Sequence, residues 1–281
     1  MRGDLNQVAL FSWVLLIGLS SGCAPQPSIP PRSKSAIDLC ARPSVSKTSL
    51  GFGSSADLES FLSKNKIKVV SSRNLPNGDI LEAHVLGFVF EFLKVPEVVR
   101  QFLVAAGVGI HLIYGRGVGE DPSFPNYSHT PDGRRWDEVP GSGGNPTRVV
   151  INRLYEGHGS VNLLLHEHAH SFDYVGIPGK GTRISNDSRW DHVMSHDLVL
   201  RDVLQKNCGD YCTENPVEAF AETFAYLHAC DASRSLLVDA NLARAFFQEL
   251  ESEVGSSLVM RPFMSTDSPP VLPLYVFPHG W

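Results

Sequence analysis

The chain has 281 residues, of which 42% are hydrophobic and 19% charged, and its formal net charge at pH 7 is −6. This composition is typical of a globular protein that is long enough to bury a sizeable core in one or two domains. Because the acidic balance offers no basic surface, we expect no nucleic-acid partner.

The first 22 residues have the layout of a signal peptide. Arg2 precedes an apolar run from Val8 to Leu19, which is too short to span a bilayer comfortably and ends in small residues before Cys23. Small residues before a cysteine resemble a bacterial lipobox, although Ser20 stands where such signals usually carry leucine. We therefore expect export, with Cys23 lipidated and anchoring the protein at the outer membrane or cell surface. Plain secretion is the alternative.

Residues 23–48 are rich in Pro, Ser and Lys, which predicts a flexible tether, and the folded domain is expected at 49–281. Caps and hydrophobic patterns predict strands and helices in mixed order, which indicates an α+β fold. The expected strands are 67–70, 110–114 and 148–152, and the expected helices are 55–64, 97–106, 163–173, 190–206, 216–228 and 235–253. The apolar segment 80–94 is helix or strand, and 115–146 and 208–215 are expected loops. Residues 148–152 form either a purely structural edge strand or one that pairs with an extended substrate.

Four cysteines remain when Cys23 is set aside, at positions 40, 208, 212 and 230. An even number in an exported chain predicts two disulfides, and three connectivities are open. Zinc thiolate ligation is less favoured, because Cys208 and Cys212 have no second close pair to complete a site and export favours oxidation.

The stretch from Leu163 to Asp173 contains an H-E-x-x-H motif, formed by His166, Glu167 and His170. Two histidines four apart on a helix lie on one face, so both can bind one zinc ion. Glu167 beside them is placed to take a proton from a metal-bound water. The apolar residues of the same stretch give the helix a side to bury. The alternative is a chance match in a chain with 11 histidines.

Catalytic zinc usually takes three protein ligands, so a third one must lie elsewhere. A metzincin extension is absent, because Asp173 and Gly176 stand where its glycine and last histidine would be. The helix expected at 216–228 carries Glu218 and Glu222 on one face. One of these can bind zinc while the other accepts a hydrogen bond from a ligating histidine. A solvated acidic face is the alternative.

The motif stretch contains two other polar residues, His168 and Asp173. His168 points about 100° or more away from the metal face, so we expect it to be partly buried or exposed. Asp173 lies one turn beyond His170, where it either orients this histidine or is solvated at the helix end.

The region around the two glutamates resembles a known family. Tyr211 precedes Glu218 by seven residues, and Phe220-Ala221-Glu222 follows. This pattern is similar to the catalytic domain of anthrax toxin lethal factor and to the secreted Pro-Pro endopeptidases of the same gluzincin clan. Segments 136–141 and 157–162 resemble those that precede the zinc helix in these proteins. The similarity spans roughly residues 130–230, with a weaker extension back to about 50.

This resemblance implies a zincin-like fold, with a small mixed sheet, an active-site helix and a mainly helical C-terminal half. It implies that Glu218 is the third zinc ligand, that Glu222 supports a zinc histidine and that Tyr211 directs its phenol at the scissile carbonyl. It implies a zinc metalloendopeptidase, a hydrolase with Zn²⁺ as cofactor and proteins or peptides as substrates. The alternative is a catalytically inactive, membrane-anchored binding lipoprotein with the same fold. Cys208 and Cys212, which flank Tyr211, depart from the family pattern.

Overall fold

The computed structural model describes residues 40, 44–70, 75–125, 129–130, 133–155, 160–177 and 180–260. The predicted signal peptide, Cys23 and most of the predicted tether lie outside these residues. Within them, the helices and strands follow the order α1 (Ser55–Lys64), β1 (Ile67–Val70), α2 (Gly78–Phe92), α3 (Glu97–Ala105), β2 (Ile110–Ile113), β3 (Gly141–Ser142), β4 (Thr147–Val150), α4 (Leu163–Val175), α5 (Ser188–His196), α6 (Leu198–Cys208), α7 (Asp210–Thr213), α8 (Pro216–Ala229), α9 (Asp231–Ser235) and α10 (Asn241–Met260).

The four strands form one mixed sheet in the order β1-β2-β4-β3. The pairs β1–β2 and β2–β4 are parallel, and β3 runs antiparallel to β4. The predicted edge strand at 148–152 is therefore an inner strand, since β3 covers its outer side. The two-residue strand β3, which lies within the expected loop 115–146, is the edge instead.

The predicted helix at 190–206 is wrong in one respect, because the structure divides it into α5 and α6. Asp197 ends the first helix and caps the second by accepting a hydrogen bond from the backbone N–H of Leu200. Its other carboxylate oxygen accepts the backbone N–H of Ala243 at 3.0 Å. The break between α5 and α6 therefore depends on a contact with α10, which is distant in sequence. The undecided segment 80–94 is helical, as part of α2.

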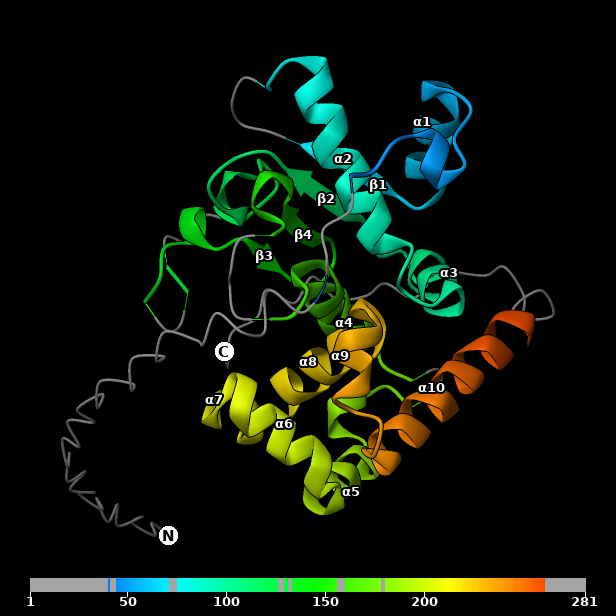
Figure 1. The fold of residues 1–281 in the computed structure, drawn as a ribbon, viewed down its shortest axis with the longest axis vertical. Coiled ribbons are helices and arrows are strands. Elements are labelled where there is room, and N and C mark those ends of the chain that lie inside the picture. Colours follow the sequence, from blue (N-terminus) through cyan, green and yellow to red (C-terminus); the bar gives the residue numbers. More distant parts are fainter. Residues whose placement is uncertain are drawn as a thin grey trace, which may run out of the picture.

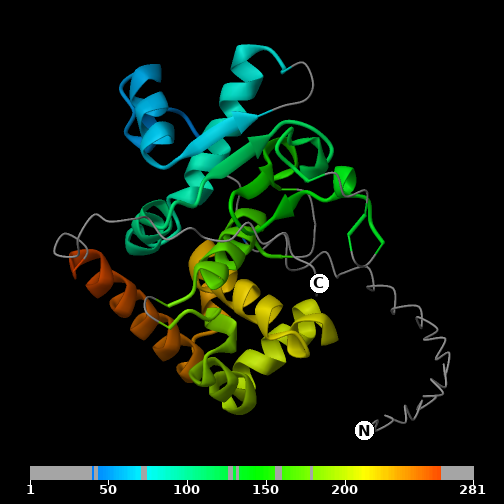
Figure 2. The ribbon, with the colours of Figure 1, turned by 180° about the vertical axis from the view of Figure 1, so that it is seen from behind.

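Helix α4 lies at the centre of the molecule, between the sheet and the helical C-terminal half (Figure 1). It contacts β4 on one side and α8 on the other. Its fully buried Phe172 lies 6.0–6.3 Å, between ring centroids, from Phe102 of α3 and from Phe220 and Phe224 of α8. The view from behind shows the same layering (Figure 2). The predicted α+β architecture with a small mixed sheet and a mainly helical C-terminal half is confirmed.

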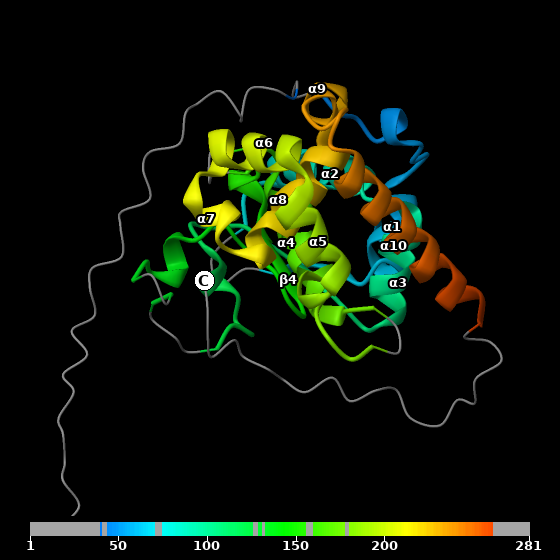
Figure 3. The same cartoon turned by 90° about the horizontal axis from the view of Figure 1, so that it is seen from below.

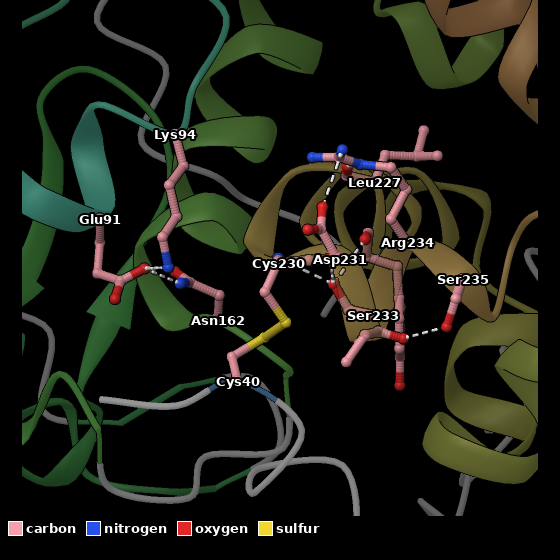
Figure 4. The surroundings of a disulfide bond; sticks show 12 residues. Cys40, Glu91, Lys94, Asn162, Leu227, Cys230, Asp231, Ser233, Arg234 and Ser235 are labelled. Carbon is pink, nitrogen blue, oxygen red and sulfur yellow. Dashed lines mark hydrogen bonds and ion pairs between the residues drawn. A yellow bond between two sulfur atoms is a disulfide. The ribbon is translucent and has the colours of Figure 1, made fainter. Parts of the chain in front are cut away.

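The two predicted disulfides are present, and the structure selects one of the three connectivities. Cys40 is bonded to Cys230 and Cys208 to Cys212, with Cα–Cα distances of 5.8 and 5.6 Å. The first bond ties Cys40, within the predicted tether, to the junction of α8 and α9 (Figure 4). Among the described residues, no helix combines the length and the apolar character needed to cross a membrane.

Candidate metal centre and active site

The motif helix α4 is fixed at its N-terminus and buried along most of its length. The side chain of Asn162 caps it by accepting the backbone N–H of Leu165 at 3.0 Å. The amide of Asn162 donates in turn to the buried Glu91 of α2 at 2.6 Å. Every residue from Leu163 to Asp173 is buried, so α4 is anchored on all sides, as a site with fixed geometry requires.

Helix α8 presents two carboxylates to α4. Asn215 caps it by accepting the N–H of Val217, and Pro216 opens it, a position where proline is favoured. Glu218 and Glu222 are each 1% exposed. The alternative of a solvated acidic face is therefore wrong. Because burying a carboxylate without a partner is costly, both groups must be paired, and their partners come from α4.

Three side chains converge from the two helices. His166 Nε2 lies 3.0 Å from His170 Nε2, and the two carboxylate oxygens of Glu218 lie 3.3 and 3.4 Å from these nitrogens. Ligand atoms held about 2.1 Å from a tetrahedral zinc ion are about 3.4 Å apart, so this spacing fits a single ion. Two imidazoles and one carboxylate also form the donor set of a catalytic zinc site that leaves a fourth position open. Within the described part of the chain, this is the group of residues that could hold a metal.

Glu222 holds one imidazole from the side away from this centre. Its Oε2 lies 3.1 Å from His166 Nδ1, and its Oε1 accepts the backbone N–H of Val161 at 3.3 Å. A carboxylate on Nδ1 fixes the tautomer that leaves Nε2 available as a metal ligand.

The charges of the two helices are matched to a cation. Burial opposes a charge on His166, but hydrogen bonds to Glu218 and Glu222 outweigh it and raise the pKa of this imidazole to about 10. Burial also opposes the ionised form of Glu218, but the imidazoles of His170 and His166 outweigh it, so the pKa of this carboxyl falls well below its usual range. The site is thus anionic whenever both imidazoles are neutral, which favours a divalent cation.

Glu167 lies beside these residues and against the edge strand β3. It is 7% exposed, and burial raises the pKa of its carboxyl above the usual value, although a hydrogen bond from the backbone of Gly143 acts in the opposite direction. A Cβ added at Gly141 would lie 2.6 Å from Glu167 Cγ, and one at Gly143 would clash with His170 Cβ. Only glycines at 141 and 143 allow β3 and the residue after it to approach α4 this closely. Sequence reasoning missed their role, although the run Gly141-Ser142-Gly143-Gly144 was the available signal.

Tyr211 reaches the same centre from the short helix α7. Burial, together with the charge of Glu218 and a hydrogen bond to it, raises the pKa of the Tyr211 phenol above its usual range. The phenol therefore stays protonated at neutral pH and is a hydrogen-bond donor. The structure thus brings together all six residues selected from the sequence, namely His166, Glu167, His170, Tyr211, Glu218 and Glu222.

Two expectations about α4 need correction or completion. His168 is 2% exposed and packs edge-on against Phe92 at 5.6 Å, so it is a core residue and not a partly buried or exposed one. The carboxylate of Asp173 accepts the backbone N–H and the hydroxyl of Ser185 at 2.5 and 3.0 Å. Asp173 therefore holds the segment that follows α4, and helix-end solvation is excluded because it is buried.

A buried H-E-x-x-H helix, crossed by a helix with a buried glutamate and flanked by a short antiparallel edge strand, defines the zincin-like class of fold. The family model described as "Anthrax toxin lethal factor, N- and C-terminal domain" matches residues 63–247, and the chain belongs to this family. The resemblance inferred from the pattern between Tyr211 and Glu222 is thereby confirmed.

Two curated relatives are both named Pro-Pro endopeptidase. The chain is 32% identical to a Pro-Pro endopeptidase of Clostridioides difficile over 111 residues, which cover 38% of this chain and 46% of the relative. It is 26% identical to a Pro-Pro endopeptidase of Paenibacillus alvei over 174 residues, covering 59% of this chain and 76% of the relative. The chain thus spans about half the length of the first relative.

A solved structure supports the fold. The Pro-Pro endopeptidase from Paenibacillus alvei superposes with a TM-score of 0.50 and 23% identity, covering 66% of this chain and 97% of the other.

Proposed function

We propose that this protein is a zinc-dependent endopeptidase. The observation that carries the proposal is the convergence of His166 Nε2, His170 Nε2 and the Glu218 carboxylate within 3.0–3.4 Å of one another, with Glu167 on the same helix. The names of the two curated relatives support the same activity. His166, His170 and Glu218 are the proposed zinc ligands, and Glu222 is the proposed support of His166.

A zinc ion at these ligands would lower the pKa of a water to about 7 and polarise a substrate carbonyl. Glu167 is the general base that takes the proton from the attacking water and then donates it to the leaving amine. Burial raises the pKa of the Glu167 carboxyl, and a carboxylate with a raised pKa is a stronger base, which suits the transfer of a proton from the water to the amine. The Tyr211 phenol donates a hydrogen bond to the carbonyl oxygen as negative charge develops on it.

The proposed substrates are proteins or peptides. Because both curated relatives are named Pro-Pro endopeptidases, peptides with a Pro–Pro bond are the first to test. An inactive binding lipoprotein is less favoured, since a residue for each catalytic role is retained. We also propose that residues 1–22 direct export and that Cys23 is the lipid anchor at the outer membrane or cell surface. Residues 23–48 are the proposed tether, which the Cys40–Cys230 disulfide joins to the domain at 49–281. These last proposals are supported by the sequence alone.

Metal analysis and a cleavage assay on one preparation test the activity. Purified protein should contain one zinc per chain and cleave members of a fluorogenic peptide library that includes Pro–Pro bonds. Glu167→Gln should retain zinc and thermal stability while kcat falls by about 10²–10⁴-fold. Glu59→Gln, at an exposed position in α1, is the control and should retain the wild-type rate. Wild-type turnover in the Glu167 variant would exclude the proposed base.

A further inference from the structure

The turn that carries Tyr211 is too short to be stable by itself. Helix α7 has four residues, and the carbonyls of Gly209 and Asp210 accept its backbone hydrogen bonds, including Cys212 N–H at 3.2 Å and Glu214 N–H at 2.9 Å. Gly209, with a positive φ of 66°, separates α7 from α6 in a backbone conformation that favours glycine. Because a single helical turn gains little from its own hydrogen bonds, contacts to other elements must hold it.

Two connections join α7 to α6. The side chain of Gln205 donates to Asp210 Oδ1 at 3.0 Å and accepts from the Thr213 hydroxyl at 3.1 Å. Both bonds are at exposed positions, where water competes for the same groups. The second connection is the Cys208–Cys212 disulfide, with Cys208 8% and Cys212 0% exposed. It closes a loop of five residues, with Tyr211 inside it.

On the other side, Tyr211 lies close enough to Glu218, near the start of α8, for this carboxylate to raise the pKa of the phenol. Figure 3 shows α7 at the end of α6, beside α8. A hydroxyl that must meet a developing charge needs a fixed position, since a displacement of about 1 Å can cost on the order of 10²-fold in rate. Covalent closure next to Tyr211 restricts the backbone that sets this position.

We propose that the Cys208–Cys212 disulfide is a covalent clamp that positions the Tyr211 hydroxyl in the active site. The inference rests on the proposed function and adds to it a positioning element outside the reacting groups. Because the two sulfurs are buried in the core and the chain is expected to be exported, the bond acts as a permanent brace.

The test compares Cys208→Ala/Cys212→Ala with Cys40→Ala/Cys230→Ala, which removes the disulfide remote from α7. Hydrogen exchange is measured on the whole chain for three backbone amides, those of Thr213, of Glu214 and of the residue at position 212. In the first double variant these amides should exchange at least tenfold faster than in wild type, while the exchange rates of the α8 amides stay unchanged. In the second they should exchange as in wild type.

The second part of the test measures kcat and KM for peptide cleavage. The first double variant should lower kcat at least fivefold while KM changes less than twofold. In a Tyr211→Phe background the same cysteine replacements should have no further effect on kcat, because the hydroxyl that they position is already absent. An equal loss in both backgrounds would show that the disulfide acts on stability alone and would overturn the proposal.

Hydrogen exchange and peptide cleavage together distinguish a failure of the clamp proposal from a failure of the proposed function. If wild-type protein cleaves no peptide of the library, the endopeptidase assignment fails, and the exchange comparison still decides whether the disulfide holds the Tyr211 turn. Unchanged exchange in α7 after removal of Cys208 and Cys212 contradicts the clamp, whatever the activity.

Discussion

Replacing Glu222 tests whether a buried carboxylate behind the proposed ligand His166 tunes the metal site. Glu222 bonds to two groups at once, His166 Nδ1 at 3.1 Å and the backbone N–H of Val161 at 3.3 Å, and it is 1% exposed. Glu222→Gln keeps the shape of the side chain and an oxygen for one partner but removes the charge. Glu222→Ala removes the acceptor of both groups at a buried position.

The expected magnitudes differ between the two variants. Loss of a carboxylate behind a ligating histidine typically lowers metal affinity 10–100-fold, or about 1.4–2.8 kcal/mol. We expect Glu222→Gln to fall in this range with a small change in the free energy of unfolding. Glu222→Ala should additionally destabilise the metal-free protein by about 2–6 kcal/mol, because each buried group left without a partner costs about 1–3 kcal/mol.

Two measurements check this reasoning. Zinc affinity is measured by competition with a chromophoric chelator, and stability by urea unfolding of the metal-free protein. Glu214→Gln, an exposed position just before α8, is the matched control and should leave both values unchanged. If Glu222→Gln binds zinc within twofold of wild type, the carboxylate does not act through His166.

Three more outcomes are expected. The raised pKa of His166 stabilises the metal-free fold fully below about pH 6.5, the value of an unperturbed histidine, and this contribution is lost as pH rises towards about 10. Urea unfolding should therefore show falling stability across this range, and zinc binding at pH 7.5 should release a proton, measured by calorimetry in buffers of different ionisation enthalpy. Gly143→Ala should destabilise the protein by about 1–3 kcal/mol and weaken zinc binding, because the added methyl meets α4, whereas Gly78→Ala, with open space around it, should do neither. Cys40→Ala/Cys230→Ala removes a link across 190 residues and should cost about 5 kcal/mol in urea unfolding while kcat is retained; a cost below about 1 kcal/mol would contradict the loop-entropy argument.

The parts of the fold that follow local rules could be predicted from the sequence. Helices with a capping side chain or an N-terminal proline, such as α1 and α8, were predicted to within a residue or two, since caps and hydrophobic spacing are local signals. The α2 segment gave no clear period because much of its C-terminal half is buried on several sides, with Phe88 and Val89 fully inaccessible. The break between α5 and α6 could not be predicted, because Asp197 forms it with a backbone group of α10.

In the candidate site, too, local sequence rules select some residues, and the tertiary fold determines the others. Spacing on single helices supplied His166, His170, Glu218 and Glu222, since residues four apart share a face whatever the tertiary fold. The contribution of β3 could not be predicted, because a two-residue strand has no pattern. Gly141 and the following Gly143 matter only through their distance from α4. Tyr211 came from the family resemblance, and no local rule would have selected it.

The most direct test of this account is anomalous diffraction at the zinc absorption edge from crystals of the purified protein. The account predicts one anomalous peak about 2.0–2.1 Å from His166 Nε2 and His170 Nε2 and about 2.0–2.2 Å from a Glu218 oxygen, with Glu167 and Tyr211 facing its open side. A zinc peak at other residues, or an empty site in protein that cleaves peptides at full rate, would contradict it.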